Sequence, residues 1–153
     1  MTTNQYHISM DELRPQPVAV VRGHVETAEI TAFLGDAFGE AMHVMTDQHL
    51  TPAGPPFARW RPTGESFDVE AGFPVSASVT PQGRVEADTL PGGPVATVMH
   101  VGDYGAVSAA YEFVTEWLGA HGYVSAGEPW ECYLDGPEVP EPKTLVRFPC
   151  GLE

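Results

Sequence analysis

The chain has 153 residues, 42% of them apolar and 10% aromatic, so it is long enough to bury a core and too apolar to stay disordered. Its formal net charge is −14, with 7 Lys and Arg against 21 Asp and Glu. Because nucleic acids and anionic membranes require clustered positive charge, we expect neither as a partner. The segment from Met1 to Leu13 lacks the basic start and apolar core of a signal peptide, and no apolar run has the length of a membrane span. We therefore expect a cytoplasmic protein.

Motifs for metal, nucleotide or nucleophile chemistry are missing from the sequence. The six histidines form no cluster with ligand spacing, and neither Cys-x-x-Cys nor His-Glu-x-x-His occurs. There is no Gly-x-Ser-x-Gly, and no glycine-rich phosphate loop precedes either predicted helix. Two cysteines, Cys132 and Cys150, are too few for a disulfide framework, and we expect reduced structural thiols. We expect no metal and no cofactor.

The first half of the chain predicts a strand, a helix and two further strands, after a start that looks disordered. Residues 17–25 are rich in β-branched side chains and predict a strand. Thr27 is the expected N-cap of a helix whose apolar residues recur three and four positions apart: Ile30, Phe33, Leu34, Ala37, Ala41, Val44 and Met45. Strands are predicted over residues 57–61 and 67–75, and residues 84–87 form another strand-like segment.

The second half predicts the same order again. Residues 94–101 begin Pro-Val-Ala-Thr-Val, close to the Pro-Val-Ala-Val-Val that begins at Pro17. A helix follows, ending near Gly122, with one apolar stripe: Val107, Ala110, Tyr111, Val114, Trp117 and Leu118. Residues 129–133 resemble residues 56–60, and residues 144–150 form the last predicted strand.

The repeated order predicts an internal duplication, with pseudo-repeats over about 17–75 and 94–150 within a single domain, 1–153. The separation is 77 residues between Pro17 and Pro94 and 73 between Pro56 and Pro129, which is too long for a solenoid repeat. The expected fold class is α+β. Duplicated strand-helix-strand-strand units would form a fused antiparallel sheet, with two main helices on one face and a central ligand cleft.

A single carboxylate lies among aromatic residues in the strand-like stretch 127–133. Alternate side chains of a strand point to opposite faces, so Glu131 and Tyr133 share one face, and Trp130 and Cys132 share the other. If the Glu131 face lines a cavity, it would suit a flat organic cation; if it faces solvent, the glutamate has no special meaning. We expect Cys132 to lie in the core, because it faces away from Glu131.

Several segments in this order resemble the GyrI-like domains, also described as bacterial transcription-activator effector-binding domains. They are Phe-Asp-Val-Glu-Ala-Gly-Phe-Pro-Val at 67–75, Val-Gly-Asp-Tyr-Gly at 101–105, Trp-Glu-Cys-Tyr-Leu at 130–134, Asp-Gly-Pro at 135–137, and 144–149. The resemblance covers nearly the whole chain from about Pro17. It implies a duplicated fold with a ligand cleft between the halves. Members of the family sense lipophilic cations as parts of transcription regulators or occur alone, and a few hydrolyse cyclopropane-containing natural products.

The resemblance also implies roles for particular residues. The pocket glutamate of the family corresponds to Glu131, whereas Leu145 stands where many members carry a second glutamate. A mechanism that needs two close carboxylates would then require Glu70, which corresponds to Leu145 in the first repeat. No helix-turn-helix region precedes the effector-type domain in this sequence, so we expect a stand-alone protein.

Four further positions are candidates for the site. Tyr133 is either a pocket residue or a core or rim aromatic, and Tyr104 either points into the cleft or packs the second helix onto the sheet. Trp60 corresponds to Tyr133 in the first repeat and Ala58 corresponds to Glu131, which predicts an asymmetric pocket with one strong charge and an aromatic wall. Asp68 shares a strand face with Glu70, and we expect it to be solvated.

Two functions follow as the main hypotheses. The first is a receptor for lipophilic, cationic aromatic compounds, with Glu131 in its pocket. The alternative is a hydrolase of cyclopropane-containing or similar electrophilic natural products, in which Glu131 activates water and Tyr133 or Tyr104 donates to the developing oxyanion. A third hypothesis is a protein-interaction partner, such as a gyrase-type inhibitor, which would need an exposed apolar patch.

Overall fold

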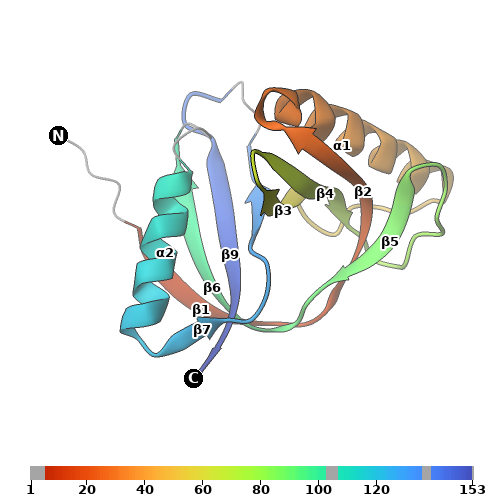
Figure 1. The fold of residues 1–153 in the computed structure, drawn as a ribbon. Helices are drawn as coiled ribbons and strands as arrows, with labels where there is room; N and C mark the ends of the chain where they lie inside the picture. Colours follow the sequence, from red (N-terminus) through yellow and green to blue (C-terminus); the bar gives the residue numbers. More distant parts are fainter. Residues whose placement is uncertain (1–5, 103–106, 136–138, 153) are drawn as a thin grey trace. The chain divides into compact units, whose positions relative to one another are not determined.

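The computed structural model describes residues 6–102, 107–135 and 139–152. Over these residues the chain forms nine strands and two α-helices, and the strands pair antiparallel (Figure 1). The predicted α+β class, with an antiparallel sheet and two main helices, is confirmed. The chain divides into two compact units, named here for their place in the sequence: a terminal unit of Met1–Arg14 with Gly92–Glu153, and a central unit of Pro15–Pro91.

The central unit is a four-stranded sheet in the order β3-β4-β2-β5, with one helix. Its elements are β2 (Gln16–Glu26), α1 (Ile30–Asp47), β3 (Phe57–Thr63), β4 (Ser66–Pro74) and β5 (Val85–Leu90). Helix α1 packs on β2 and β4 through an apolar stripe, buried at Ala37, Ala41, Val44 and Met45. Phe38 of this helix meets Phe73 of β4 edge to face, with ring centroids 5.8 Å apart. The side of β4 that carries Phe73 is therefore the side covered by α1.

The terminal unit is a sheet in the order β1-β6-β9-β8, with β7 paired to the end of β9. Its elements are β1 (Ile8–Leu13), β6 (Gly93–Val101), α2 (Ser108–Ala120), β7 (Tyr123–Ser125), β8 (Trp130–Tyr133) and β9 (Lys143–Leu152). Helix α2 covers one face of β6 and β9 (Figure 1). Its stripe forms a core with residues of the two strands: Ala96, Val98, Ala110, Val114, Leu118, Val146, Phe148 and Cys150.

Apart from β1, β5 and β7, both units contain the same succession of strand, helix, strand and strand. In each, the first strand pairs with the last and the last pairs with the third, as β2-β4-β3 and β6-β9-β8. This succession agrees with the order of elements predicted for the two halves. The single-domain description and the origin by duplication stay predictions.

Two strands and one helix cap differ from the sequence prediction. Strand β1 lies in the start that looked disordered, and its only β-branched residue is Ile8; it forms because β6 supplies a full row of backbone partners. The short strand β7 was also missed. The expected cap at Thr27 is wrong by one residue: Thr27 is already in a 3₁₀ turn, and the Glu26 amide donates to Oε1 of Glu29 at 2.9 Å.

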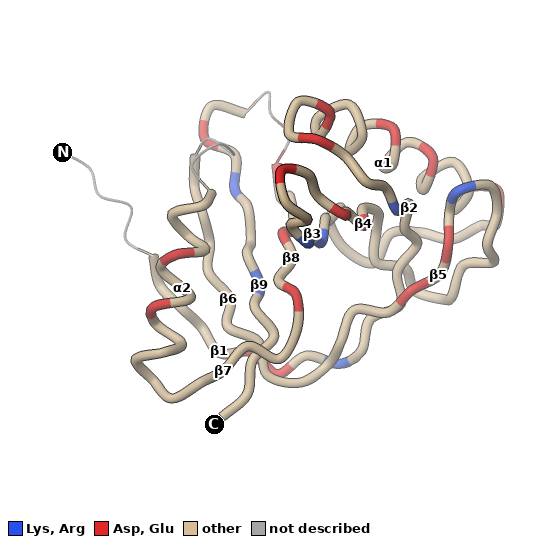
Figure 2. The backbone as a smooth tube through the Cα atoms, in the orientation of Figure 1, with Lys and Arg blue, Asp and Glu red and all other residues tan. Residues whose placement is uncertain are grey.

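Neither described helix combines the length and the apolar character needed to cross a bilayer. Acidic residues occur on both helices, whereas the few Lys and Arg residues lie mostly on strands (Figure 2).

Candidate ligand-binding site

Strand β8 places Glu131 and Tyr133 on the helix-covered face of the terminal unit. In the register with β9, Glu131 pairs with Val146 and Tyr133 pairs with Thr144. Val146 belongs to the core beneath α2, and directly paired residues of antiparallel strands share a face. Glu131 therefore points toward α2.

The location of Glu131 corrects the expectation for Cys132. The face opposite Glu131 is not the helix-packed core: Cys132 is only half-buried there, beside the fully buried Trp130. The cysteine in the core is Cys150, which packs under α2. Burial raises the pKa of both thiols, and both are free of disulfides.

Glu131 is a buried carboxylate held by two phenols. The residue is 9% exposed. The Tyr111 hydroxyl, from α2, donates to Oε2 at 2.6 Å, and the Tyr133 hydroxyl donates to Oε1 at 3.1 Å. No ion pair within the described residues includes Glu131. The protein thus solvates this charge with neutral donors instead of a salt bridge.

Burial is the main cause of the pKa shifts of Glu131 and Tyr111. Desolvation raises the pKa of Glu131, while the hydrogen bonds from Tyr111 and Tyr133 and the nearby His100 ring act in the opposite direction. Burial, followed by the Glu131 charge, raises the pKa of Tyr111, so its phenol stays protonated and remains a donor. A bound cation would favour the ionised carboxylate and lower its pKa.

A buried histidine lies two strands further along the same face. His100 of β6 is 0% exposed, and its Nδ1 is 2.9 Å from the Tyr6 hydroxyl. The Tyr6 ring also contacts Phe113 of α2, with centroids 5.5 Å apart. In register, His100 and Tyr133 both pair with Thr144 of β9, which joins them in one row across the sheet.

The first-repeat candidates lie in the central unit. Ala58 and Trp60 pair in register with Ala71 and Val69 of β4, on the side covered by α1. Ala58 is fully buried, and Trp60 is half-buried, with its ring edge to face on Phe67 at a centroid distance of 6.0 Å. The Trp60 Nε1 is buried without a hydrogen-bond partner among the described residues.

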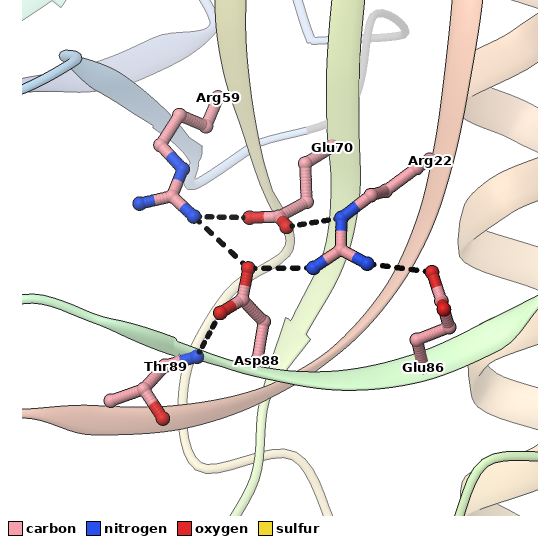
Figure 3. A network of polar contacts seen from close by, with 6 residues as sticks. All are labelled: Arg22, Arg59, Glu70, Glu86, Asp88 and Thr89. Carbon is pink, nitrogen blue, oxygen red and sulfur yellow. Dashed lines mark hydrogen bonds and ion pairs between the residues drawn. The ribbon is translucent and has the colours of Figure 1, made fainter.

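Glu70 lies on the other side of β4, inside a network of ion pairs (Figure 3). Arg59 Nη2 donates to its Oε1 at 2.6 Å, and Arg22 Nε donates to its Oε2 at 3.0 Å. The two arginines also reach Asp88 Oδ2, at 3.2 and 2.9 Å, and Arg22 reaches Glu86 at 2.6 Å. The candidate second carboxylate is thus already paired with two cations of its own unit.

The two carboxylates at the centre of this network, Glu70 and Asp88, have pKa values that are shifted in opposite directions. Burial, followed by a hydrogen bond with Asp88, raises the pKa of Glu70 to about 7, whereas Arg59 acts to lower it. Hydrogen bonds, first from Glu70, lower the pKa of Asp88 to about 2. Asp68 is not simply solvated as expected: it accepts from Arg61 at 2.6 Å and lies 2.7 Å from Nδ1 of His24.

Tyr104 lies outside the described residues. Within the described ranges, no three His, Cys, Asp or Glu side chains gather closely enough to hold a metal ion.

Sequence reasoning missed Tyr111, His100, Thr144 and Tyr6. Tyr111 appeared only as a member of a packing stripe, and His100 was weighed only as a metal ligand. One signal was available: Tyr111 is the polar member of an otherwise apolar stripe, and a buried tyrosine usually finds a hydrogen-bond partner.

The chain matches the family model described as "GyrI-like small molecule binding domain" over residues 6–149. It therefore belongs to the GyrI-like small molecule binding domain family. A search of curated proteins found no match to the chain.

Solved structures similar to the chain include the C-terminal domain of EcmrR, with 22% identity, coverage of 97% of this chain and 99% of that one, and a TM-score of 0.84. EcmrR in a DNA complex gives 23% identity and a TM-score of 0.84; the match covers 97% of this chain but only 58% of that one. SAV2435 bound to tetraphenylphosphonium matches with 13% identity, coverage of 95% and 94%, and a TM-score of 0.58. A structure called a hydrolase from Listeria innocua matches with 13% identity, coverage of 94% and 91%, and a TM-score of 0.68. At these identities the likeness shows the fold.

Proposed function

We propose that this chain binds lipophilic aromatic cations and that Glu131 is the charge that selects them. The observation that carries the proposal is a buried carboxylate, bonded to two phenols, that takes part in no ion pair within the described residues. A buried charge without an opposite charge beside it is costly even when it is hydrogen-bonded, so a ligand that brings the opposite charge recovers part of that free energy.

The aromatic rings around Glu131 support the same ligand class. A cation over an aromatic face gains about 0.5–2 kcal/mol when it is desolvated, and Tyr111 and Tyr133 both contact the carboxylate. The fold neighbour SAV2435 was solved with tetraphenylphosphonium, a lipophilic cation. The expected roles of Trp60, Ala58 and Tyr104 as ligand contacts stay predictions. Because Glu70 has two arginine partners, the proposed receptor uses Glu131 as its carboxylate.

We propose no nucleic-acid contact for the described residues. Arg22, Arg59, Arg61 and Arg84 are all in ion pairs with carboxylates, and the chain carries a net charge of −14. Sequence-independent phosphate binding requires clustered free positive charge, and these pairs leave only Arg14, Lys143 and Arg147 of the described Lys and Arg residues outside an ion pair. EcmrR was solved with DNA, but the match covers 58% of that chain.

A fluorescence anisotropy titration tests the proposal. Tetramethylrhodamine methyl ester supplies a flat cation, and a neutral boron-dipyrromethene dye of similar size supplies the control ligand. Glu131→Gln should raise the dissociation constant of the cationic dye at least tenfold. The dissociation constant of the neutral dye should stay within about twofold of the wild-type value, because only the cation interacts with the charge. Glu128→Gln, an exposed neighbour, should change neither. Equal weakening of both dyes by Glu131→Gln would contradict the proposal.

A hydrolase is the second candidate, because Glu131 also has the features of a general base. Burial raises its pKa above the ordinary value of 4.5, and two phenols lie within hydrogen-bond distance of it. The ionised carboxylate would take a proton from water while the water oxygen attacks a carbon of a strained ring. The ring bond breaks, its electron pair takes a proton, and the product is heavier by one water. The fold neighbour from Listeria innocua is called a hydrolase.

Mass spectrometry of a cyclopropane-containing electrophile incubated with the protein separates the two functions. An enzyme would give the hydrated product catalytically with the wild type and none with Glu131→Gln. A receptor would return the compound unchanged from both proteins.

A further inference from the structure

A row of polar side chains crosses the helix-covered face of the terminal unit, starting next to Glu131. Tyr133 of β8, Thr144 of β9 and His100 of β6 are consecutive partners in the strand register. Directly paired residues in antiparallel strands have Cβ atoms about 4.5–5.5 Å apart and point the same way. Thr144 therefore lies between the tyrosine that holds Glu131 and the buried histidine.

Thr144 is the member of this row with an unused polar group. The residue is 0% exposed, and its Oγ1 has no hydrogen-bond partner among the described residues. A buried hydroxyl without a partner costs about 1–3 kcal/mol, so such groups call for an explanation. Its neighbours are engaged: the Tyr133 hydroxyl donates to Glu131, and His100 Nδ1 bonds to Tyr6.

A second threonine in the same sheet provides a comparison. Thr97 of β6 is 5% exposed, and its Oγ1 also has no partner among the described residues. Side chains alternate along β6, so Thr97 lies on the face opposite His100, away from Glu131. Thr144 and Thr97 are both buried threonines of the same sheet, each with a hydroxyl that has no partner in the described part of the chain. They differ in that only Thr144 lies on the face that carries Glu131.

We infer that Thr144 is a further ligand contact, whose hydroxyl bonds, directly or through one bridging water, to an N–H or O–H group of the bound cation. The site would then favour cations that carry hydrogen-bonding groups over fully alkylated ones. This inference rests on the proposed cation-binding function and deepens it. Glu131 attracts the positive charge of the ligand, and Thr144 forms a hydrogen bond with its N–H or O–H group.

Two rhodamine dyes test this inference, because they differ only in that group. Rhodamine 123 and tetramethylrhodamine methyl ester share the xanthene core, the methyl ester and the single positive charge, but only rhodamine 123 has N–H groups. Thr144→Val removes the hydroxyl at nearly constant volume. The variant should raise the dissociation constant of rhodamine 123 about fivefold, which is the effect of one neutral hydrogen bond. The dissociation constant of the tetramethyl dye should stay within about twofold of the wild-type value.

Two more variants serve as controls. Thr144→Ser keeps a hydroxyl and should bind rhodamine 123 like the wild type. Thr97→Val removes the matched hydroxyl on the other face and should change neither dye. Neither valine variant should have a lower melting temperature than the wild type, because each removes an unpartnered polar group.

The inference is overturned if Thr144→Val weakens both dyes equally, leaves both unchanged, or acts no differently from Thr97→Val. Failure of the underlying function looks different. In that case the wild type binds neither dye, or Glu131→Gln binds the tetramethyl dye as tightly as the wild type does.

Discussion

The Tyr111 hydroxyl donates a 2.6 Å hydrogen bond to Oε2 of Glu131, which joins helix α2 to strand β8. A short bond to an ionised acceptor is about twice as strong as a neutral one. This contact stabilises the charge of Glu131 without neutralising it, as the proposed binding of a cation requires.

Tyr111→Phe should raise the pKa of Glu131 further, because the variant loses the largest of the effects that lower it. Because a larger fraction of the carboxyl is then protonated at any given pH, affinity for a cationic dye should fall and recover as the pH is raised. A ¹³C NMR titration of the Glu131 carboxyl measures the pKa directly. Tyr123→Phe, which removes a phenol of the same unit that stacks on Trp117, should leave the titration unchanged.

The stability of Glu131→Gln relative to the wild type should increase as the pH rises from acid to alkaline values. Burial raises the folded-state pKa of Glu131 above its ordinary value of 4.5. The group thus contributes stability that is full below the unfolded pKa and is lost as the pH rises through the folded pKa. Glutamine does not titrate, so the difference in unfolding free energy between the variant and the wild type should be constant below about pH 4.5 and change in favour of the variant above it.

Urea denaturation of both proteins from pH 4 to pH 9 measures this difference. Glu128→Gln, at an exposed position, supplies the baseline. A difference between Glu131→Gln and the wild type that stays constant over the whole pH range would contradict the assignment of a raised pKa.

Arg59→Met should destabilise the central unit more at pH 8 than at pH 5.5. The pKa of Glu70 is about 7, so at pH 8 the variant leaves a buried carboxylate with one arginine partner instead of two. We expect a loss of about 2 kcal/mol in unfolding free energy at pH 8 and a smaller loss when Glu70 is protonated. Arg84→Met breaks an exposed pair with Glu40 and should cost less than about 1 kcal/mol at either pH. Equal losses for Arg59→Met at both pH values would contradict this account.

Gly72→Ala should strongly destabilise the central sheet. A Cβ at this position would overlap the Ala19 carbonyl oxygen of the neighbouring strand β2. Because backbone cannot move aside cheaply, we expect a loss of more than about 2 kcal/mol. Gly39→Ala, in the open on helix α1, should instead stabilise by about 0.5–1 kcal/mol. Thermal denaturation of the two variants tests the close pairing of β4 with β2.

Local periodicity predicted the elements and the faces of this fold well. The alternation of β8 placed Glu131 and Tyr133 together, and the helical stripe placed Ala110, Val114 and Leu118 in a core. It could not predict β1, since an edge strand with one β-branched residue is stabilised by its partner β6 and not by its own propensity.

The sequence could not predict the arginine partners of Glu70 or the contact of Glu131 with Tyr111, because these partners lie far away along the chain. Glu70 was a candidate for the pocket because its counterpart in the second repeat is Leu145, but its arginines come from positions 22 and 59. Tyr111 is 20 residues from Glu131 along the chain. Only the packing of α2 on the sheet brings these two side chains together.

The measurement that tests the central claim most directly is the pKa of Glu131, followed by ¹³C NMR with and without tetraphenylphosphonium. If the cation binds against this carboxylate, its charge favours the ionised form, and the pKa should fall when the ligand is added. If the protein binds the cation while the titration of Glu131 stays unchanged, the charge at Glu131 does not select the ligand, and the account is wrong.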